Sequence, residues 1–158
     1  MVDFEPRRRT SVSLTPADRA VLKAVTKRLA VELGFNPTRQ QVADWCLNLL
    51  DEALFQQPTT NLPKPLGRHR DKLWKMSNFS FTPSQEKVIE SAGDRLSALF
   101  DDLSLVQMSS ILSYAFRLAA KRLHIPVQRA AAEEIRDTAV SDVLNMVLGG
   151  DVSDEAED

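Results

Sequence analysis

The chain contains one pattern twice. The segment Ser11–Pro16 (SVSLTP) returns 67 positions later as residues 78–83 (NFSFTP). In both copies apolar residues alternate with small polar ones, which is typical of a strand with one buried face. Each strand then reaches a threonine followed by a proline, Thr15 and Thr82 being suited to a helix N-cap and the proline to the first helical position. Because a strand of about six residues on two helices leaves an unpaired edge, the repeat predicts two half-folds that pair.

Two amphipathic helices follow each strand. The first helices share apolar positions at helical spacing: Val21, Leu22, Val25, Leu29 and Leu33 correspond to Val88, Ile89, Ala92, Leu96 and Phe100. The second helices correspond at an offset of 66: Val42, Trp45, Cys46, Leu49 and Leu50 match Met108, Ile111, Leu112, Ala115 and Phe116. Thr38 and Ser104 precede these second helices, each three residues before a glutamine, and are predicted to cap them. Strand, helix, turn and helix are therefore predicted twice.

These elements divide the chain into five parts. The first repeat covers residues 7–55, a proline-rich basic linker covers 56–74, and the second repeat covers 75–124. An amphipathic helix is expected over 127–148, before an acidic tail over 149–158. The predicted fold class is mainly α with a two-stranded antiparallel β-ribbon.

Composition narrows the functional classes. Apolar residues make up 43% and charged residues 27% of the 158 residues, a balance typical of a globular protein. With no apolar run near the roughly 20 residues that span a bilayer, neither a membrane nor a secreted protein is expected, and we predict a cytoplasmic location in a bacterium or archaeon. Cys46 is the single cysteine, and the two histidines are far apart in sequence, so we expect no disulfide and no metal site. No nucleophile with a matching base is apparent; we expect no catalytic residues, no cofactor and no enzyme activity.

The net charge of −2 hides a local imbalance. Five of the 22 acidic residues lie in the last eight positions, and without them 20 basic residues face 17 acidic ones. An arginine run, 7–9, lies directly at the first strand. Local positive charge of this kind favours a nucleic-acid partner.

Both repeats resemble the ribbon-helix-helix family of the Arc, methionine and CopG-type repressors over about 45 residues each. The residues that carry the resemblance are 9–15, 34–39 and 41–54 in the first half, and 76–82 and 102–107 in the second. The resemblance implies a tandem ribbon-helix-helix pseudo-dimer with an additional C-terminal helix. The second half departs from the family in having no glycine in its turn, where Asp101 and Asp102 stand instead.

In that family the ribbon enters the major groove, and its outward side chains read base edges. The inward positions are Thr10, Val12, Leu14, Ser77, Phe79 and Phe81, so the predicted base-contacting residues are Arg9, Ser11, Ser13, Met76, Asn78 and Ser80. The N-terminus of the second helix clamps flanking phosphates. The predicted phosphate contacts, with the arginine run included, are Arg7, Arg8, Asn36, Thr38, Arg39, Ser104 and Leu105.

The resemblance implies sequence-specific binding of double-stranded DNA, with transcriptional repression as the expected role. Two alternatives stay open: an accessory factor in plasmid transfer or partition, and an antitoxin-like or scaffold protein that acts through its C-terminal helix. That helix, 127–148, is also a candidate for self-association or for a protein partner. Because the two strands differ, we expect an asymmetric or imperfectly symmetric site. Pairing of the repeats within one chain or between two chains is left open by the sequence.

Overall fold

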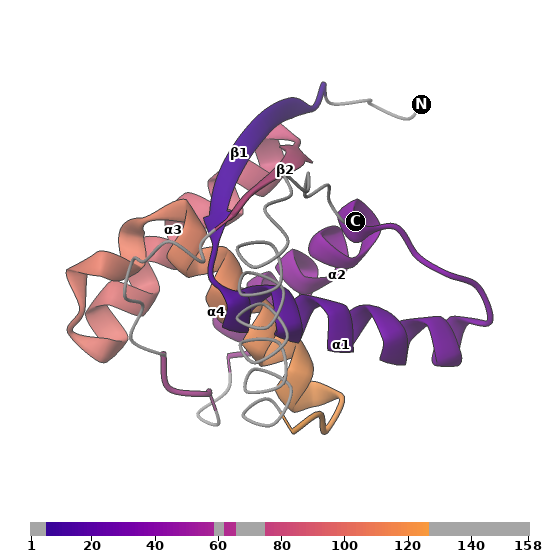
Figure 1. The fold of residues 1–158 in the computed structure, drawn as a ribbon. Coiled ribbons are helices and arrows are strands. Elements are labelled where there is room, and N and C mark those ends of the chain that lie inside the picture. The colour runs from indigo at the N-terminus through magenta and orange to yellow at the C-terminus, as the bar shows by residue number, and fades with distance from the viewer. Residues whose placement is uncertain (1–5, 59–61, 66–74, 127–158) are drawn as a thin grey trace, which may run out of the picture.

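The two repeats pair within a single chain. A computed structural model describes residues 6–58, 62–65 and 75–126. Strand β1 (Arg8–Leu14) and strand β2 (Lys75–Phe81) form a two-stranded antiparallel sheet, with Ser11 opposite Asn78 at its centre (Figure 1). The predicted fold class, mainly α with an antiparallel β-ribbon, is confirmed.

Three of the four long helices begin with the predicted cap. Helices α1 (Pro16–Leu33), α2 (Arg39–Asp51) and α3 (Pro83–Phe100) follow Thr15, Thr38 and Thr82. In each, the threonine hydroxyl accepts a hydrogen bond from the backbone N–H three residues on, and the side chain of that residue accepts one from the threonine N–H. These reciprocal bonds satisfy amides that a helix start otherwise leaves unpaired.

The fourth helix begins differently, and the prediction that Ser104 caps it is wrong. Helix α4 (Met108–Arg122) has Gln107 at its N-cap without a side-chain hydrogen bond, and a 3₁₀ helix, η2 (Leu103–Val106), precedes it. Leu105 in η2 is only 4% exposed. This turn lies against α3 at Gly93, where an added Cβ would be 3.2 Å from Cα of Val106 and 3.4 Å from the carbonyl oxygen of Leu105. The turn is therefore packed onto α3 as a short 3₁₀ helix with Leu105 buried.

The core lies beneath the ribbon. The inward strand residues Val12, Leu14, Phe79 and Phe81 are each at most 3% exposed, as the alternation predicts. The ring of Phe79 lies 6.0 Å from that of Phe81 and 6.4 Å from that of Phe116. Helix α4 packs against both α1 and α2, which places it in the middle of the helical layer (Figure 1). Cys46 is completely buried there, as expected for a packing residue.

Two polar contacts join the repeats below the ribbon. The hydroxyl of Ser113 in α4 donates to Oδ1 of Asp18 in α1 at 2.5 Å, and both side chains are buried. At the related place, Nε2 of Gln85 in α3 donates to Oδ1 of Asp44 in α2 at 2.7 Å. In both cases the residue that completes a helix cap also contacts the second helix of the other repeat. The caps therefore stabilise the pairing as well as the helix starts.

The middle of the connector is packed against α4. Helix α2 continues into one π-helical turn, η1 (Glu52–Gln56), which ends one residue inside the predicted linker. The hydroxyl of Tyr114 donates to the carbonyl oxygen of Pro63 at 2.7 Å, and Arg117 donates to that of Lys64 at 2.5 Å. The rest of the linker, together with the predicted helix 127–148 and tail 149–158, lies outside the described residues.

Candidate nucleic-acid interface

All six predicted base-contacting residues lie on the outward face of the ribbon. The register pairs Arg9 with Ser80, Ser11 with Asn78, and Ser13 with Met76. Arg9, Ser11, Met76 and Asn78 are exposed, whereas Ser13 and Ser80 are partly exposed. Because the opposite face is buried, this face is the one that the sheet leaves exposed.

Side-chain hydrogen bonds between the strands connect the residues of two of these pairs. The hydroxyl of Ser11 donates to Oδ1 of Asn78 at 2.7 Å. The hydroxyl of Ser13 donates to the sulfur of Met76 at 3.0 Å. The carboxamide of Asn78 is thereby oriented, and its Nδ2 group is left to donate outward.

The first turn of α2 covers the outer edge of β2. Oε1 of Gln40 accepts a hydrogen bond from the backbone N–H of Ser80 at 2.7 Å. Arg39 donates to the carbonyl oxygen of Asn78 at 3.4 Å, and its guanidinium lies 5.4 Å from the ring centre of Phe79. These contacts fix the position of the ribbon relative to the N-terminus of α2.

Asp44 binds three side chains at the same edge. Its carboxylate accepts from Nε2 of Gln40 at 2.9 Å, from Nε2 of Gln85 at 2.7 Å, and from Arg7 at 3.1 Å. Arg7 also donates to the carbonyl oxygen of Ser80 at 2.8 Å. Arg7, a predicted phosphate contact, is therefore held by groups of its own chain. A phosphate there would compete with Asp44 for the guanidinium.

The other predicted phosphate contacts of the first repeat lie on the surface. Asn36 and Thr38 are exposed before the positive end of the α2 dipole, and Arg39 is partly exposed in its first turn. The Arg8 side chain is 78% exposed and lies 3.9 Å from Glu86, so this surface ion pair holds it weakly.

The described residues of the second repeat do not form the corresponding arrangement. The side chain of Leu105 is buried, and its N–H donates to the carbonyl oxygen of Asp102 at 3.2 Å, so neither group of this predicted phosphate contact is presented to a ligand. The Ser104 side chain lies outside the described part of the structure. Val106, at the position that corresponds to Gln40, is 53% exposed. Among the described side chains, an exposed polar helix start of the kind implied by the family resemblance is therefore seen in the first repeat, at Asn36, Thr38 and Arg39.

Sequence reasoning predicted Gln85 as the cap partner of Thr82, and the structure has this contact, but it did not find Gln40, Asp44 or the hydrogen bond between Gln85 and Asp44. Gln40 and Asp44 look like ordinary polar residues on a helix surface, and the contacts of these side chains with the second repeat cross about 40 residues of sequence. Comparison of the two repeats gives one sequence signal for Gln40 and Asp44. Gln40 and Asp44 have Val106 and Ser110 at the corresponding positions of the second repeat, which marks them as features of one half.

No family model, no curated protein and no solved structure matches the chain. In the part of the chain that the structure describes, the fold is an antiparallel β-ribbon over four main helices. Among the described residues, no helix is both long and apolar enough to cross a membrane. In the same residues no three His, Cys, Asp or Glu side chains are grouped so that they would hold a metal ion.

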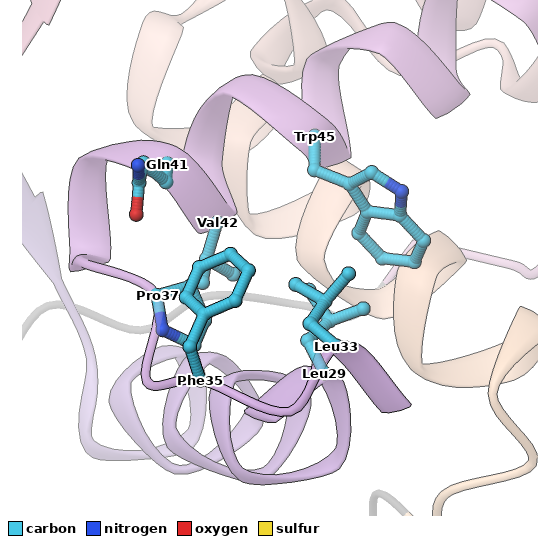
Figure 2. A pocket seen from close by; sticks show the side chains of 7 residues that line it. All are labelled: Leu29, Leu33, Phe35, Pro37, Gln41, Val42 and Trp45. Atoms are coloured by element: carbon cyan, nitrogen blue, oxygen red, sulfur yellow. The ribbon is translucent and has the colours of Figure 1, made fainter. Parts of the chain in front are cut away.

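One apolar pocket of about 230 Å³ lies away from the ribbon, between the end of α1 and the start of α2 (Figure 2). Its lining residues are Leu29, Leu33, Phe35, Pro37, Gln41, Val42 and Trp45. In the second repeat the turn is packed onto α3 at Gly93, with Leu105 buried. Thr26 occupies the position that corresponds to Gly93, and the turn of the first repeat forms no 3₁₀ helix. The pocket is thus a packing difference between the two halves.

Proposed function

We propose that this protein binds double-stranded DNA sequence-specifically by placing the outward face of its ribbon in the major groove. The observation that carries the proposal is the set of three opposed outward pairs, in which five of the six residues are polar, on one face of a sheet whose other face is buried. Two strands lie about 5 Å apart, and a strand of seven residues is roughly 23 Å long. A ribbon of that size fits a groove about 12 Å wide.

The chemistry of the outward residues suits base edges. Arginine binds the two acceptors of guanine, O6 and N7, and asparagine binds adenine at N6 and N7. Asn78 retains Nδ2 as a donor, while its Oδ1, which has a second lone pair, already accepts from Ser11. Serine hydroxyls bind donors or acceptors, and Met76 offers apolar contact with a thymine methyl group.

Backbone contacts would come from the first repeat. The start of α2 presents Asn36 and Thr38 beside Arg39, and Arg8 extends from the adjacent strand. Helix N-termini and arginines bind phosphate oxygens, and this contribution weakens as the salt concentration rises.

The biological role that we propose is transcriptional repression. A second role, as an accessory factor for DNA transfer, is favoured by the presence of two unlike repeats in one chain. The position of the binding site separates the two roles. A repressor binds beside a promoter, whereas a transfer factor binds at an origin of transfer.

Selection of binding sites from a random duplex library, followed by affinity measurements, tests the proposal. Replacing Arg9 or Asn78 with alanine should weaken binding to the selected site by about 1–3 kcal/mol, or roughly 5- to 150-fold. Binding to unrelated DNA should change little for Asn78→Ala, and thermal stability should be nearly unchanged for both because the side chains face outward.

Arg28→Ala and Asn48→Ala are the matched controls, since both residues are exposed on helices away from the ribbon. Arg28→Ala removes the same charge as Arg9→Ala. Equal losses in the ribbon variants and in these controls, or selection of no sequence at all, would show that the ribbon does not read DNA.

A further inference from the structure

The two ends of the ribbon carry different chemistry. In the antiparallel register, Ser11 and Asn78 are at the centre, and a pseudo-twofold axis there relates Arg9 to Met76. Arg9 lies opposite Ser80 at one end, and Met76 lies opposite Ser13 at the other. We call these the Arg9 end and the Met76 end. Two identical strands would carry the same residues at both.

The Arg9 end is joined to the start of α2. Gln40 accepts from the N–H of Ser80, and Arg39 lies against Phe79 and the carbonyl oxygen of Asn78. Arg8 and Arg9 are both exposed at this end. This end of the ribbon therefore combines Arg9, the proposed base-reading arginine, with the N-terminus of α2.

Among the described residues, the Met76 end differs from the Arg9 end in its base-reading position and its helix start, whereas Arg8 has a cationic counterpart there, the exposed Lys75. Met76 is 62% exposed, and the position that corresponds to Arg39 is the buried Leu105. The turn before α4 presents Asp101 and Asp102, both exposed, which repel phosphate. Arg19, close to this end of β1, donates to the carbonyl oxygen of Leu14.

We infer that the ribbon binds its DNA site in one fixed orientation. The Arg9 end lies over a half-site that contains guanine and is held to the adjacent phosphates, whereas the Met76 end lies over a half-site that offers a thymine methyl group. This inference rests on the proposed function and adds the polarity of the complex to it. Its physical basis is that reversal would place Met76 against guanine acceptors and leave them without a donor.

Met76→Arg is the direct test, because it gives the second end the base-reading residue of the first. Site selection with the full chain should return a guanine at one side of the wild-type site and not at the symmetry-related position. Met76→Arg should add a preference for guanine there, on the opposite strand, of roughly 5- to 150-fold. The selected sites should then approach an inverted repeat.

Glu90→Gln is the matched control, since it raises the charge by the same single unit at an exposed position of α3. It should leave the selected sequence unchanged. A guanine preference that appears in both variants, or in neither, would overturn the assignment of Met76 to a base-reading position.

Orientation is measured separately by cleavage. An iron chelate attached to a cysteine at position 75 (Lys75→Cys), beside Met76 in β2, should cut the selected duplex on one side only; Cys46 is fully buried and should not be labelled. Equal cutting on both sides, or a perfect inverted repeat selected by the wild-type protein, would refute fixed polarity while leaving DNA binding intact. Selection of no sequence would refute both proposals.

Discussion

Asp18 provides the sharpest test of how the repeats are held together. Its side chain is 5% exposed and makes two kinds of contact. Oδ2 accepts from the N–H of Thr15 at 3.0 Å and completes the cap of α1. Oδ1 accepts from the hydroxyl of Ser113, in the other repeat, at 2.5 Å.

The cost of Asp18→Ala follows from these contacts. Loss of the reciprocal cap costs about 1 kcal/mol. The buried hydroxyl of Ser113 loses its acceptor, which costs about 1–3 kcal/mol more. We therefore expect the free energy of unfolding to fall by about 2–4 kcal/mol, a large part of the roughly 5–15 kcal/mol that is typical of a folded protein.

Urea unfolding of the full chain, followed by circular dichroism, measures this loss. Gln41→Ala is the matched control, since Gln41 completes the cap of α2 in the same way but is exposed. It should cost about 1 kcal/mol or less. A double-mutant cycle between Asp18→Ala and Ser113→Ala should give a coupling energy of about 1–2 kcal/mol. If Asp18→Ala costs no more than Gln41→Ala, or if the coupling is zero, the contact between the repeats does not contribute as argued.

Three further predictions concern the core, the turns and the buried thiol. Phe79→Ala should lower the free energy of unfolding in urea by about 3–5 kcal/mol, because it removes a buried aromatic ring beneath the ribbon. Asp101 ends α3 in the left-handed region with φ at 51°, as Gly34 ends α1 with φ at 80°. Asp101→Gly should therefore raise the free energy of unfolding by about 1 kcal/mol, and Gly34→Ala should lower it by about the same amount. Thermal unfolding measures both changes as shifts of the midpoint temperature. Burial raises the pKa of the Cys46 thiol, so the native protein should resist a thiol reagent that labels the urea-unfolded chain at once. The Cys46 thiol ionises near pH 8.5 only in the unfolded chain, so its contribution to stability is complete below that pH and falls above it. Cys46→Ala should therefore lose less stability than the wild-type protein between pH 8 and pH 10. An equal loss in both proteins would contradict this.

Much of the architecture could be predicted because its signals are local. Alternating residues mark both strands, and the threonine–proline pairs at residues 15 and 82 mark two helix starts; the structure has both features. The outward face follows from the same alternation, since a strand places every second side chain on one side. The candidate base-reading residues were accessible to sequence reasoning for that reason.

The remaining features depend on contacts between distant segments. Ser104 is a residue type typical of a helix cap, but it lies in a 3₁₀ helix, where its neighbour Leu105 is buried and the turn packs against α3. Arg7 stays a predicted phosphate contact, but sequence reasoning did not foresee that its guanidinium donates to Asp44. Neither outcome is visible until the helices are packed, because the competing partner lies on another element.

Because β1 and β2 belong to one polypeptide, dilution of the protein does not separate the two strands of the ribbon. A ribbon assembled from two chains falls apart when its concentration drops below the dissociation constant of the dimer. Here the sheet closes in a first-order step, so its midpoint of unfolding does not depend on how many molecules are present. A single copy in a cell keeps both strands together.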